Sequence, residues 1–522
     1  MALVDSRVVT LSEVIAAPSA RLDPHYFALF PRIAAIVDGI VDPVRLEPPA
    51  VLVANGLNLP EAAYDYAADD PPYRYASVTA ISQYSFRTDR AVPLKDPDSF
   101  TYKTSLADAA VGPLDVLVTR SNAIAPGVAW PAAEAWAEGG PRIVPSGFVI
   151  RLKVDPNRLD PFYAAAVLNH PVWRMWTAAL AAGKSQLNIS QAQLADVCIP
   201  GVTRDLQDSL GGQYRQLLAA IATGLAAAEG FAARCDHLLA NHAGLAVPPL
   251  RHSRLTVDHL RLSAVLCASE GMRIDARFHR GEVRQILGLL DNQPTTTLRE
   301  LIVGDLVKGS QPPLVNEDEA TPFAGPRVVS TGCIQGGAVV PELTKLTTEE
   351  CFDRAGVRQL SGGDVVLTMD GEGSIGKAAT FSGDFDAVPD SHVAILRLAD
   401  PTQAPAVVCV INSSLGQAQV DLSTTGSTGQ TQISKADALG LRIPIVALKR
   451  SEALSQPFQD LTESFENAGA SIRRLVCENA AALGQDLCAS GAFTEPAAAA
   501  MTAISDPETL LAYLQRIKDV AT

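Results

Sequence analysis

Long apolar runs are missing from this sequence, and none reaches the roughly 18 residues that a membrane-spanning helix needs. The N-terminus, MALVDSRVVTLSEV, contains Asp5 and has neither a basic segment nor an uninterrupted apolar one. We therefore expect no signal peptide, no membrane partner and a cytoplasmic protein. The eight cysteines are scattered without any C-x-x-C pair, which favours reduced, buried thiols over disulfides or a zinc site.

Positive charge is also scarce. The chain has 42 Lys and Arg residues against 57 Asp and Glu residues, which gives a formal net charge of −15. Because affinity for a phosphate backbone comes from Lys and Arg, the chain is not expected to coat nucleic acid by itself. If it binds DNA, a partner supplies much of the positive field. The length of 522 residues, 47% of them hydrophobic, predicts about two to four globular domains.

Catalytic signatures are absent or incomplete. The sequence has no G-x-S-x-G, no H-E-x-x-H and no N-P-P-[YF] of an adenine methyltransferase. Gly371, Gly376 and Lys377 have the spacing of a phosphate-binding loop, but Ala378 stands where that loop needs Ser or Thr. The next residues, AATFSGDFDAVP, predict strand and turn rather than a helix whose N-terminus faces phosphates. We predict a glycine turn after a β-strand, and a non-catalytic chain with no metal site and no cofactor.

One pattern occurs twice, about 250 residues apart. RLDPHYFALFPRI, from Arg21, is echoed by RIDARFHRGEVRQIL, from Arg273. GKSQLNISQAQLADVCIP, which ends at Pro200, is echoed by STGQTQISKADALGLRIP, which ends at Pro444. Between these anchors PLDVLVTRS parallels GGDVVLTMD, and IVPSGFVIRL parallels AVPDSHVAILRL. Four anchors in the same order predict an internal duplication.

Each copy is predicted to be mostly strand and turn, with one short helix before its Gln-x-x-Ile-Ser element and with Ser190 and Ser434 as N-caps. A long helix with apolar residues at 4-3 spacing follows each copy, which favours two paired helices. The small Gly224 and Ala228 would admit a phenylalanine of the partner helix. Two helices that each pack on their own domain are the alternative. The residues expected to pair the helices are Leu210, Leu217, Ile221, Phe231, Leu238, Leu454, Phe458, Leu461, Phe465, Ile472 and Leu475.

These features resemble the specificity subunit of type I restriction-modification enzymes, from about Leu11 to about Leu487. The most specific carriers are AAGKSQLNISQAQLADVCIPGV, TTGSTGQTQISKADALGLRIPIV and GDVVLTMDGEGSIGK. The first copy is more divergent, since it has RSNAIAPGVAW where a glycine turn would be expected. The resemblance implies an α+β fold with two β-rich target recognition domains in tandem, each followed by a long helix, and the two helices pairing as an antiparallel coiled coil.

The bounds that follow are a first recognition domain at 1–204, a first spacer helix at 205–243, a linker at 244–256, a second recognition domain at 257–446, a second spacer helix at 447–490 and a helical tail at 491–522. The resemblance also implies the partners. These are double-stranded DNA, whose split site is read one half by each domain, and two DNA adenine methyltransferase subunits held by the helices. A restriction or translocase subunit is a further partner that the resemblance allows.

Reading bases in the major groove needs Arg or Lys for guanine and Asn or Gln for adenine, on exposed loops. A solvated surface group is the alternative for each candidate, and Gln186 and Gln430 could instead cap the turn before Ile-Ser. The candidates in the first copy are Gln83, Tyr84, Arg87, Arg90, Lys103, Arg120, Asn122, Lys184 and Gln186. In the second copy they are Lys308, Gln311, Thr331, Gln335, Lys345, Arg358, Lys377, Thr428 and Gln430.

Two other functions remain open from the residues. The chain could be the targeting subunit of another phage-defence complex that uses the same module. It could also be a stand-alone ATPase built around the loop at 371–378, although Ala378 argues against that.

Overall fold

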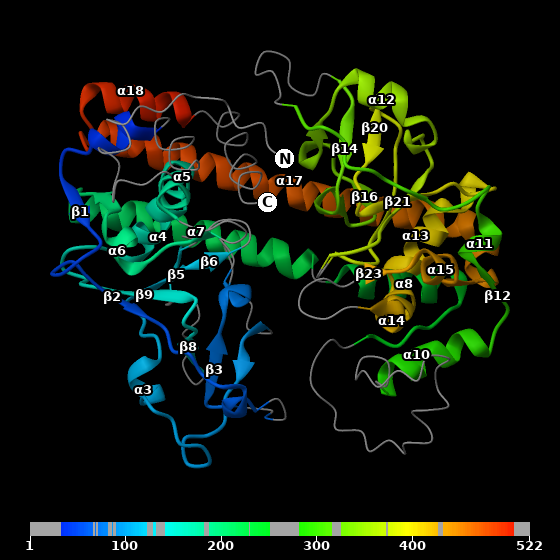
Figure 1. The fold of residues 1–522 in the computed structure, drawn as a ribbon, viewed down its shortest axis with the longest axis horizontal. Helices are drawn as coiled ribbons and strands as arrows, with labels where there is room; N and C mark the ends of the chain where they lie inside the picture. The colour runs from blue at the N-terminus through cyan, green and yellow to red at the C-terminus, as the bar shows by residue number, and fades with distance from the viewer. Residues whose placement is uncertain are drawn as a thin grey trace. The chain divides into compact units, whose positions relative to one another are not determined.

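The computed structural model divides the chain into two compact units, unit 1 (1–224 with 471–522) and unit 2 (225–470), and Figure 1 labels many of their elements. Within the part of the chain that the structure describes, no helix is both long and apolar enough to cross a membrane. The residues described are 33–65, 68, 71–81, 86, 90–122, 129–131, 141–181, 187–228, 230–250, 281–315, 325–371, 374–425 and 432–505. The anchor that begins at Arg21 lies outside them except for its last residue, and the anchor that begins at Arg273 is described only from Gly281, where α10 (Gly281–Asp291) begins.

Unit 1 is built on an antiparallel sheet with strand order β2-β9-β5-β7 and a smaller sheet with order β4-β3-β8. Two short ladders, β1 with β11 and β6 with β10, tie the ends of the unit together. The strands are β1 (Pro43–Arg45), β2 (Val51–Asn55), β3 (Tyr73–Ala76), β4 (Val92–Pro93), β5 (Asp115–Thr119), β6 (Ser121–Asn122), β7 (Ala129–Pro131), β8 (Arg142–Pro145), β9 (Val149–Val154), β10 (Leu187–Asn188) and β11 (Cys198–Pro200).

Unit 2 has a six-stranded sheet with order β13-β21-β18-β19-β16-β15 and a smaller sheet with order β17-β14-β20. Its short ladders are β12 with β24 and β22 with β23. The strands are β12 (Thr295–Thr297), β13 (Val307–Lys308), β14 (Arg327–Val329), β15 (Ile334–Gln335), β16 (Ala338–Val339), β17 (Lys345–Leu346), β18 (Val365–Thr368), β19 (Ala378–Thr380), β20 (Ala387–Pro389), β21 (Val393–Leu396), β22 (Thr424–Thr425), β23 (Gln432–Ile433) and β24 (Arg442–Pro444).

The two units pair their strands in the same way. In unit 1, β3 is parallel to β8 and antiparallel to β4; in unit 2, β14 is parallel to β20 and antiparallel to β17. The β2–β9–β5–β7 run corresponds to β13–β21–β18–β19. The duplication seen in the sequence therefore extends to the strand pairing of the described residues.

Each unit has two short helices where the sequence predicted one. They are α4 (Pro161–Asn169) and α5 (Pro171–Leu180) in unit 1, and α13 (Ala404–Asn412) and α14 (Ser414–Ser423) in unit 2. His170 and Ser413 interrupt the helices because each is extended and its side chain accepts a backbone N–H of the following helix. The prediction missed both interruptions because it treated the apolar residues before and after each polar break as one helix.

A buried asparagine before each interruption ties the helix pair to the sheet. The Asn169 side chain accepts the N–H of Ala129 (3.1 Å) and donates to its C=O (2.6 Å). Asn412 makes the same two bonds to Ala378, at 3.2 and 2.8 Å. Both asparagines thus pair with backbone groups of β7 or β19 that would otherwise be buried without hydrogen bonds.

The first long helix is divided, in contrast to the continuous helix predicted at 205–243. Helix α7 (Arg204–Ala228) ends before Gly230, which is the non-helical N-cap of α8 (Phe231–Ala243). Glycine favours such a break because it loses more backbone freedom than other residues when it becomes helical. The packing of Gly224 and Ala228 lies outside the described side chains.

The second long helix, α17 (Ser451–Ala489), buries Leu454 and Phe458. Later in the helix, Val476 is 7% exposed while its neighbour Leu475, expected to pair the helices, is 36% exposed. The buried face therefore passes through Val476, since a helix advances 3.6 residues a turn and a strict heptad drifts. Helix α18 (Glu495–Ile504) follows, and a β-carbon on Gly484 of α17 would touch Ser505 beside it.

The other expected pairing residues are buried or partly buried. Leu210, Leu217 and Ile221 of α7 are at most 6% exposed. In unit 2, Phe231 of α8 lies against two rings of α17, with centroid distances of 4.9 Å to Phe465 and 6.3 Å to Phe458. Pairing along the whole length, through Leu238, Leu461 and Ile472, stays a prediction.

Candidate nucleic-acid interface

The phosphate-loop interpretation of 371–378 is contradicted by the backbone of unit 2. Strand β18 ends at Thr368 and β19 begins at Ala378, so a strand and not a helix follows the glycines. Gly371 (φ 106°) and Gly376 (φ 77°) adopt the positive φ expected of a tight turn. A β-carbon on Gly376 would lie 2.6 Å from the Val420 side chain, so this position has no room for one.

Thr368 holds the turn closed. Its hydroxyl accepts the backbone N–H of Lys377 at 2.8 Å, and its C=O accepts the N–H of Gly376 at 3.0 Å. The Lys377 side chain reaches solvent, but desolvation by the protein around it lowers the pKa of its amine. An exposed lysine on this turn can contact an anion, but the strand that follows it does not provide the helix N-terminus of a Walker loop.

A cluster of charged groups surrounds the start of this turn. The Asp370 carboxylate lies 3.7 Å from Lys308 Nζ through one oxygen and is hydrogen-bonded to His392 Nδ1 through the other. The Lys308 and His392 side chains are 51% and 53% exposed, so the cluster faces solvent. We call Lys308, Asp370 and His392 the charged triad.

Further charges adjoin the charged triad. Burial raises the pKa of Asp390, whose carboxylate accepts the N–H of His392, while the charges of His392 and Lys345 act in the opposite direction. Arg358 donates from Nε to the backbone C=O of Lys308 at 3.2 Å. Three sequence candidates, Lys308, Lys345 and Arg358, are thus brought to one region of unit 2.

The remaining candidates of unit 2 are more dispersed. Gln335 is exposed on β15 and donates to the C=O of Gly332, Thr331 begins the 3-10 turn before it, and Gln311 is exposed after β13. Thr428 and Gln430 lie outside the described residues. Sequence reasoning missed Asp370 and His392 as site residues, although the alignment of AVPDSH with IVPSGF places His392 opposite Phe148.

In unit 1 fewer candidates can be placed. Arg90 and Lys103 are exposed and apart in the chain, Arg120 is half-buried, and Asn122 pairs with Leu187 in the β6–β10 ladder. Arg120 donates its N–H to the C=O of Phe148 at 2.9 Å. The candidates Gln83, Tyr84, Arg87, Lys184 and Gln186 lie outside the described residues.

The Ile-Ser elements are anchored beside these turns in both units. Ser190 and Ser434 accept the N–H groups of Gln193 and Asp437, so both are the N-caps that the sequence predicted. The N–H of Ile189 bonds to the C=O of Arg120, and that of Ile433 bonds to Met369, each at 2.9 Å. The two repeated elements therefore occupy the same place in the fold.

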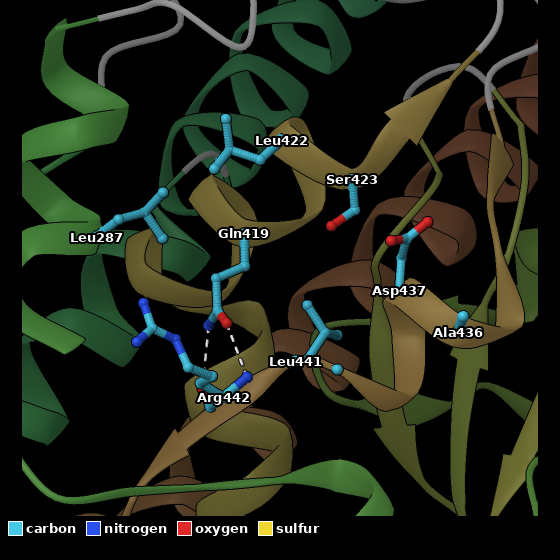
Figure 2. Close-up of a pocket in the computed structure, with 9 residues that line it drawn as sticks. Leu287, Gln419, Leu422, Ser423, Ala436, Asp437, Leu441 and Arg442 are labelled. Atoms are coloured by element: carbon cyan, nitrogen blue, oxygen red, sulfur yellow. Dashed lines mark hydrogen bonds between the residues drawn. The ribbon is translucent and has the colours of Figure 1, made fainter. Parts of the chain in front are cut away.

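Two open hollows occur in unit 2, and neither has the features of a ligand site. Figure 2 shows the first, of about 250 Å³, lined by Leu287, Asp437 and Arg442 among others. Its amide, Gln419, accepts the backbone N–H of Arg442 at 2.7 Å and donates to the same residue's C=O at 3.0 Å. The second, of about 360 Å³, is lined in part by Arg354 and Arg358. Among the described residues no group of three His, Cys, Asp or Glu side chains could hold a metal ion.

No family model and no curated protein matches this sequence. Among solved structures, the chain is similar to the S subunit of a type I restriction-modification system from M. genitalium, with 12% identity, 87% of this chain and 96% of that chain covered, and a TM-score of 0.36. It is also similar to a chain from a study of assembly and conformational transition of the type I R-M system (14%, 84% and 98%, TM-score 0.26). A third is the HsdS subunit from Thermoanaerobacter tengcongensis (12%, 84% and 97%, TM-score 0.23).

Proposed function

We propose that this chain is the DNA-specificity subunit of a type I-like restriction-modification, or methyltransferase, complex. Each β-rich domain reads one half of a bipartite DNA site, and the paired long helices hold the two domains and two methyltransferase subunits. The chain itself performs no catalysis and binds no cofactor. The domain bounds are those inferred from the sequence, with the recognition domains at 1–204 and 257–446.

The observation that carries this proposal is that the two units share their strand pairing and buried hydrogen bonds but differ in their exposed side chains. The two units repeat strand pairing, the Asn169 and Asn412 ties and the serine caps. At equivalent surface positions they differ, since unit 2 presents the charged triad where unit 1 presents the 58% exposed Phe148. A protein that reads two different half-sites needs this combination, because orientation is common to both and base contacts are not.

The charge balance fits a subunit that works with partners. The net charge is −15, and Lys308 is already paired with Asp370. Methyltransferase subunits would close around the DNA and supply most phosphate contacts, while this chain contributes base contacts. The targeting subunit of another phage-defence complex is the second candidate, and neighbouring ATPase or kinase genes of unfamiliar type would favour it over a nuclease-translocase gene.

The test is co-purification with the methyltransferase encoded beside the gene, followed by the methylome of the host with and without this gene. We expect one bipartite methylated motif that disappears on deletion. A methylome that deletion leaves unchanged would contradict the proposal.

A further inference from the structure

The hairpin between β15 and β16 turns on two consecutive glycines that touch the long helices of unit 2. Gly336 and Gly337 have φ values of 55° and 82°, which L side chains rarely adopt. A β-carbon on Gly336 would lie 2.6 Å from Cδ1 of Phe465, and one on Gly337 would lie 2.8 Å from Cζ of Phe458. Both positions therefore require glycine for two independent reasons, backbone conformation and space.

The rings beneath the turn come from both helices. Phe458 and Phe465 belong to α17, and Phe231, whose Cζ would lie 3.2 Å from a β-carbon on Gly337, belongs to α8. Phe231 packs edge-on against Phe465 with centroids 4.9 Å apart. The glycine pair thus lies against the place where the two helices meet, and aromatic pairs of this kind have a preferred geometry.

The hairpin also lies at one end of the six-stranded sheet, while β13, which carries Lys308, lies at the other. Neighbouring strands are ~4.8 Å apart, so the two edges are ~24 Å apart and a tilt of about 10° at the hairpin would move the far edge by ~4 Å. That displacement exceeds the ~3.4 Å rise of one base pair. A small change at the glycine pair is therefore amplified at the charged triad.

We propose that the Gly336–Gly337 turn, seated on Phe231, Phe458 and Phe465, is the joint that fixes the angle of the second recognition domain on the helices, and with it the spacing at which the second half-site is read. This inference rests on the proposed function. The glycines and rings are positioning residues, since none of them needs to touch DNA.

The joint is tested first without DNA, by a double-mutant cycle on the Tm of the full chain. Gly336→Ala adds a methyl group against Phe465, and we expect it to lower the Tm by about 3 °C or more. Phe465→Ala removes the ring, so adding Gly336→Ala to it should lower the Tm by less than it does alone. The matched control is Gly356→Ala, because Gly356 also has a positive φ (54°) but nothing within 4 Å of its β-carbon position. The changes in Tm from Gly356→Ala and Phe465→Ala should add. If the changes from Gly336→Ala and Phe465→Ala also add strictly, the proposed joint is overturned.

The second arm measures spacing with the chain assembled on its methyltransferase, by selection from random DNA duplexes. Wild type should select two half-sites at one spacing, whereas Phe465→Ala and the milder Phe465→Leu should select the same half-sites with the spacing spread by a base pair or more. Unchanged spacing in both variants, or equal loss of both half-sites, would overturn the inference. If wild type selects no bipartite site but the double-mutant cycle shows coupling, the proposed function is wrong and the glycine–phenylalanine contact stands. If wild type selects a bipartite site but the cycle shows no coupling, only the proposed joint is wrong.

Discussion

Units 1 and 2 each pair a buried aspartate with an arginine, but the arginine stands at a different strand position in each unit. Asp115 and Asp364 stand at the start of equivalent strands, and each accepts the N–H of the residue three positions earlier, at 2.7 and 2.9 Å. Asp115 pairs with Arg151 at 2.5 Å, whereas Asp364 pairs with Arg397 at 3.3 Å. Lys153 lies directly opposite Asp115, and Arg397 follows Leu396, which lies opposite the residue after Asp364. Strand register therefore makes Lys153, not Arg151, the equivalent of Arg397.

Residues two apart on a strand share a face, so an arginine at either position can reach the aspartate. Both guanidiniums also bind backbone carbonyls of the preceding segment, those of Asp108 and Ala109 in one case and of Val357 and Gln359 in the other. Both units therefore place a guanidinium on this face of the sheet, at strand positions two residues apart.

The largest expected effect distinguishes these two pairs. Arg151→Met leaves Asp115, which is 4% exposed, buried without an ion-pair partner, and we expect a loss of about 3–5 kcal/mol in the free energy of unfolding. Arg397→Met should cost less, about 1–3 kcal/mol, because the Arg397 side chain is 33% exposed and water can replace part of the pair. Urea denaturation of both variants measures this, and equal losses would contradict the distinction.

The two units should respond alike to loss of the buried asparagine that each uses to bind a strand. Asn169→Ala and Asn412→Ala each unpair one buried backbone N–H and one C=O, so each should cost about 2–4 kcal/mol. Hydrogen exchange should show faster exchange at Ala129 in the first variant and at Ala378 in the second, each within its own unit. A loss in only one of the two would show that the asparagine ties are not equivalent.

Unit 2 has a buried carboxylate at the start of its second short helix that should make stability depend on pH. Asp236 of α8 accepts the N–H of Ser414 (2.9 Å) and its hydroxyl (2.6 Å), and burial raises the pKa of Asp236 from 3.8 to about 6, with the Ser414 bonds acting in the opposite direction. The equivalent helix of unit 1 begins with Pro171, which has no N–H.

Because the pKa of Asp236 is higher in the folded state, its contribution to stability is present below pH 4 and is lost as the pH rises through about 6. We expect this loss to be about 2–3 kcal/mol. Asp236→Asn can still accept the Ser414 N–H, can donate to the Ser414 hydroxyl oxygen and removes the titration. The free energies of unfolding of wild type and variant should therefore diverge between pH 4 and 7. Parallel pH profiles would rule out this role for Asp236.

Part of this architecture could be predicted from sequence. β-Branched runs and flanking turn residues indicated β5, β9, β18 and β21. The Ile-Ser pairs indicated Ser190 and Ser434 as N-caps of the turns that follow them. Both signals are local in the sequence. The glycine turn at 371–376 was predicted because the missing Ser or Thr and the following strand pattern excluded a Walker loop.

Other features depend on distant partners and leave no local signal. The interruption at Ser413 needs only an extended serine within an apolar run, and the charged triad unites residues from three separate segments. The glycines at 336 and 337 look like an ordinary hairpin turn, and only the tertiary fold puts Phe465 beneath them. The interruption after His170 was more accessible, since Pro171 already disfavours a helical residue before it.

The smallest expected effect concerns the turn that resembles a phosphate loop. Lys377→Ala should leave the chain without any change in ATP hydrolysis, and should weaken DNA binding by the assembled complex about equally on all sequences, lowering the salt slope by about 1. Salt-dependent binding titrations check this. A loss of measurable ATP turnover in the variant would instead favour the ATPase alternative.

The most direct test of the central claim is base selection by the assembled complex carrying Phe148→Ala in unit 1 or Asp370→Asn in unit 2. Each unit is proposed to read one half-site, so each variant should change base preference in one half only, by about 10-fold or more at the affected position. The half that changes should differ between the two variants. A change in both halves from either variant, or in the same half from both, would contradict the account.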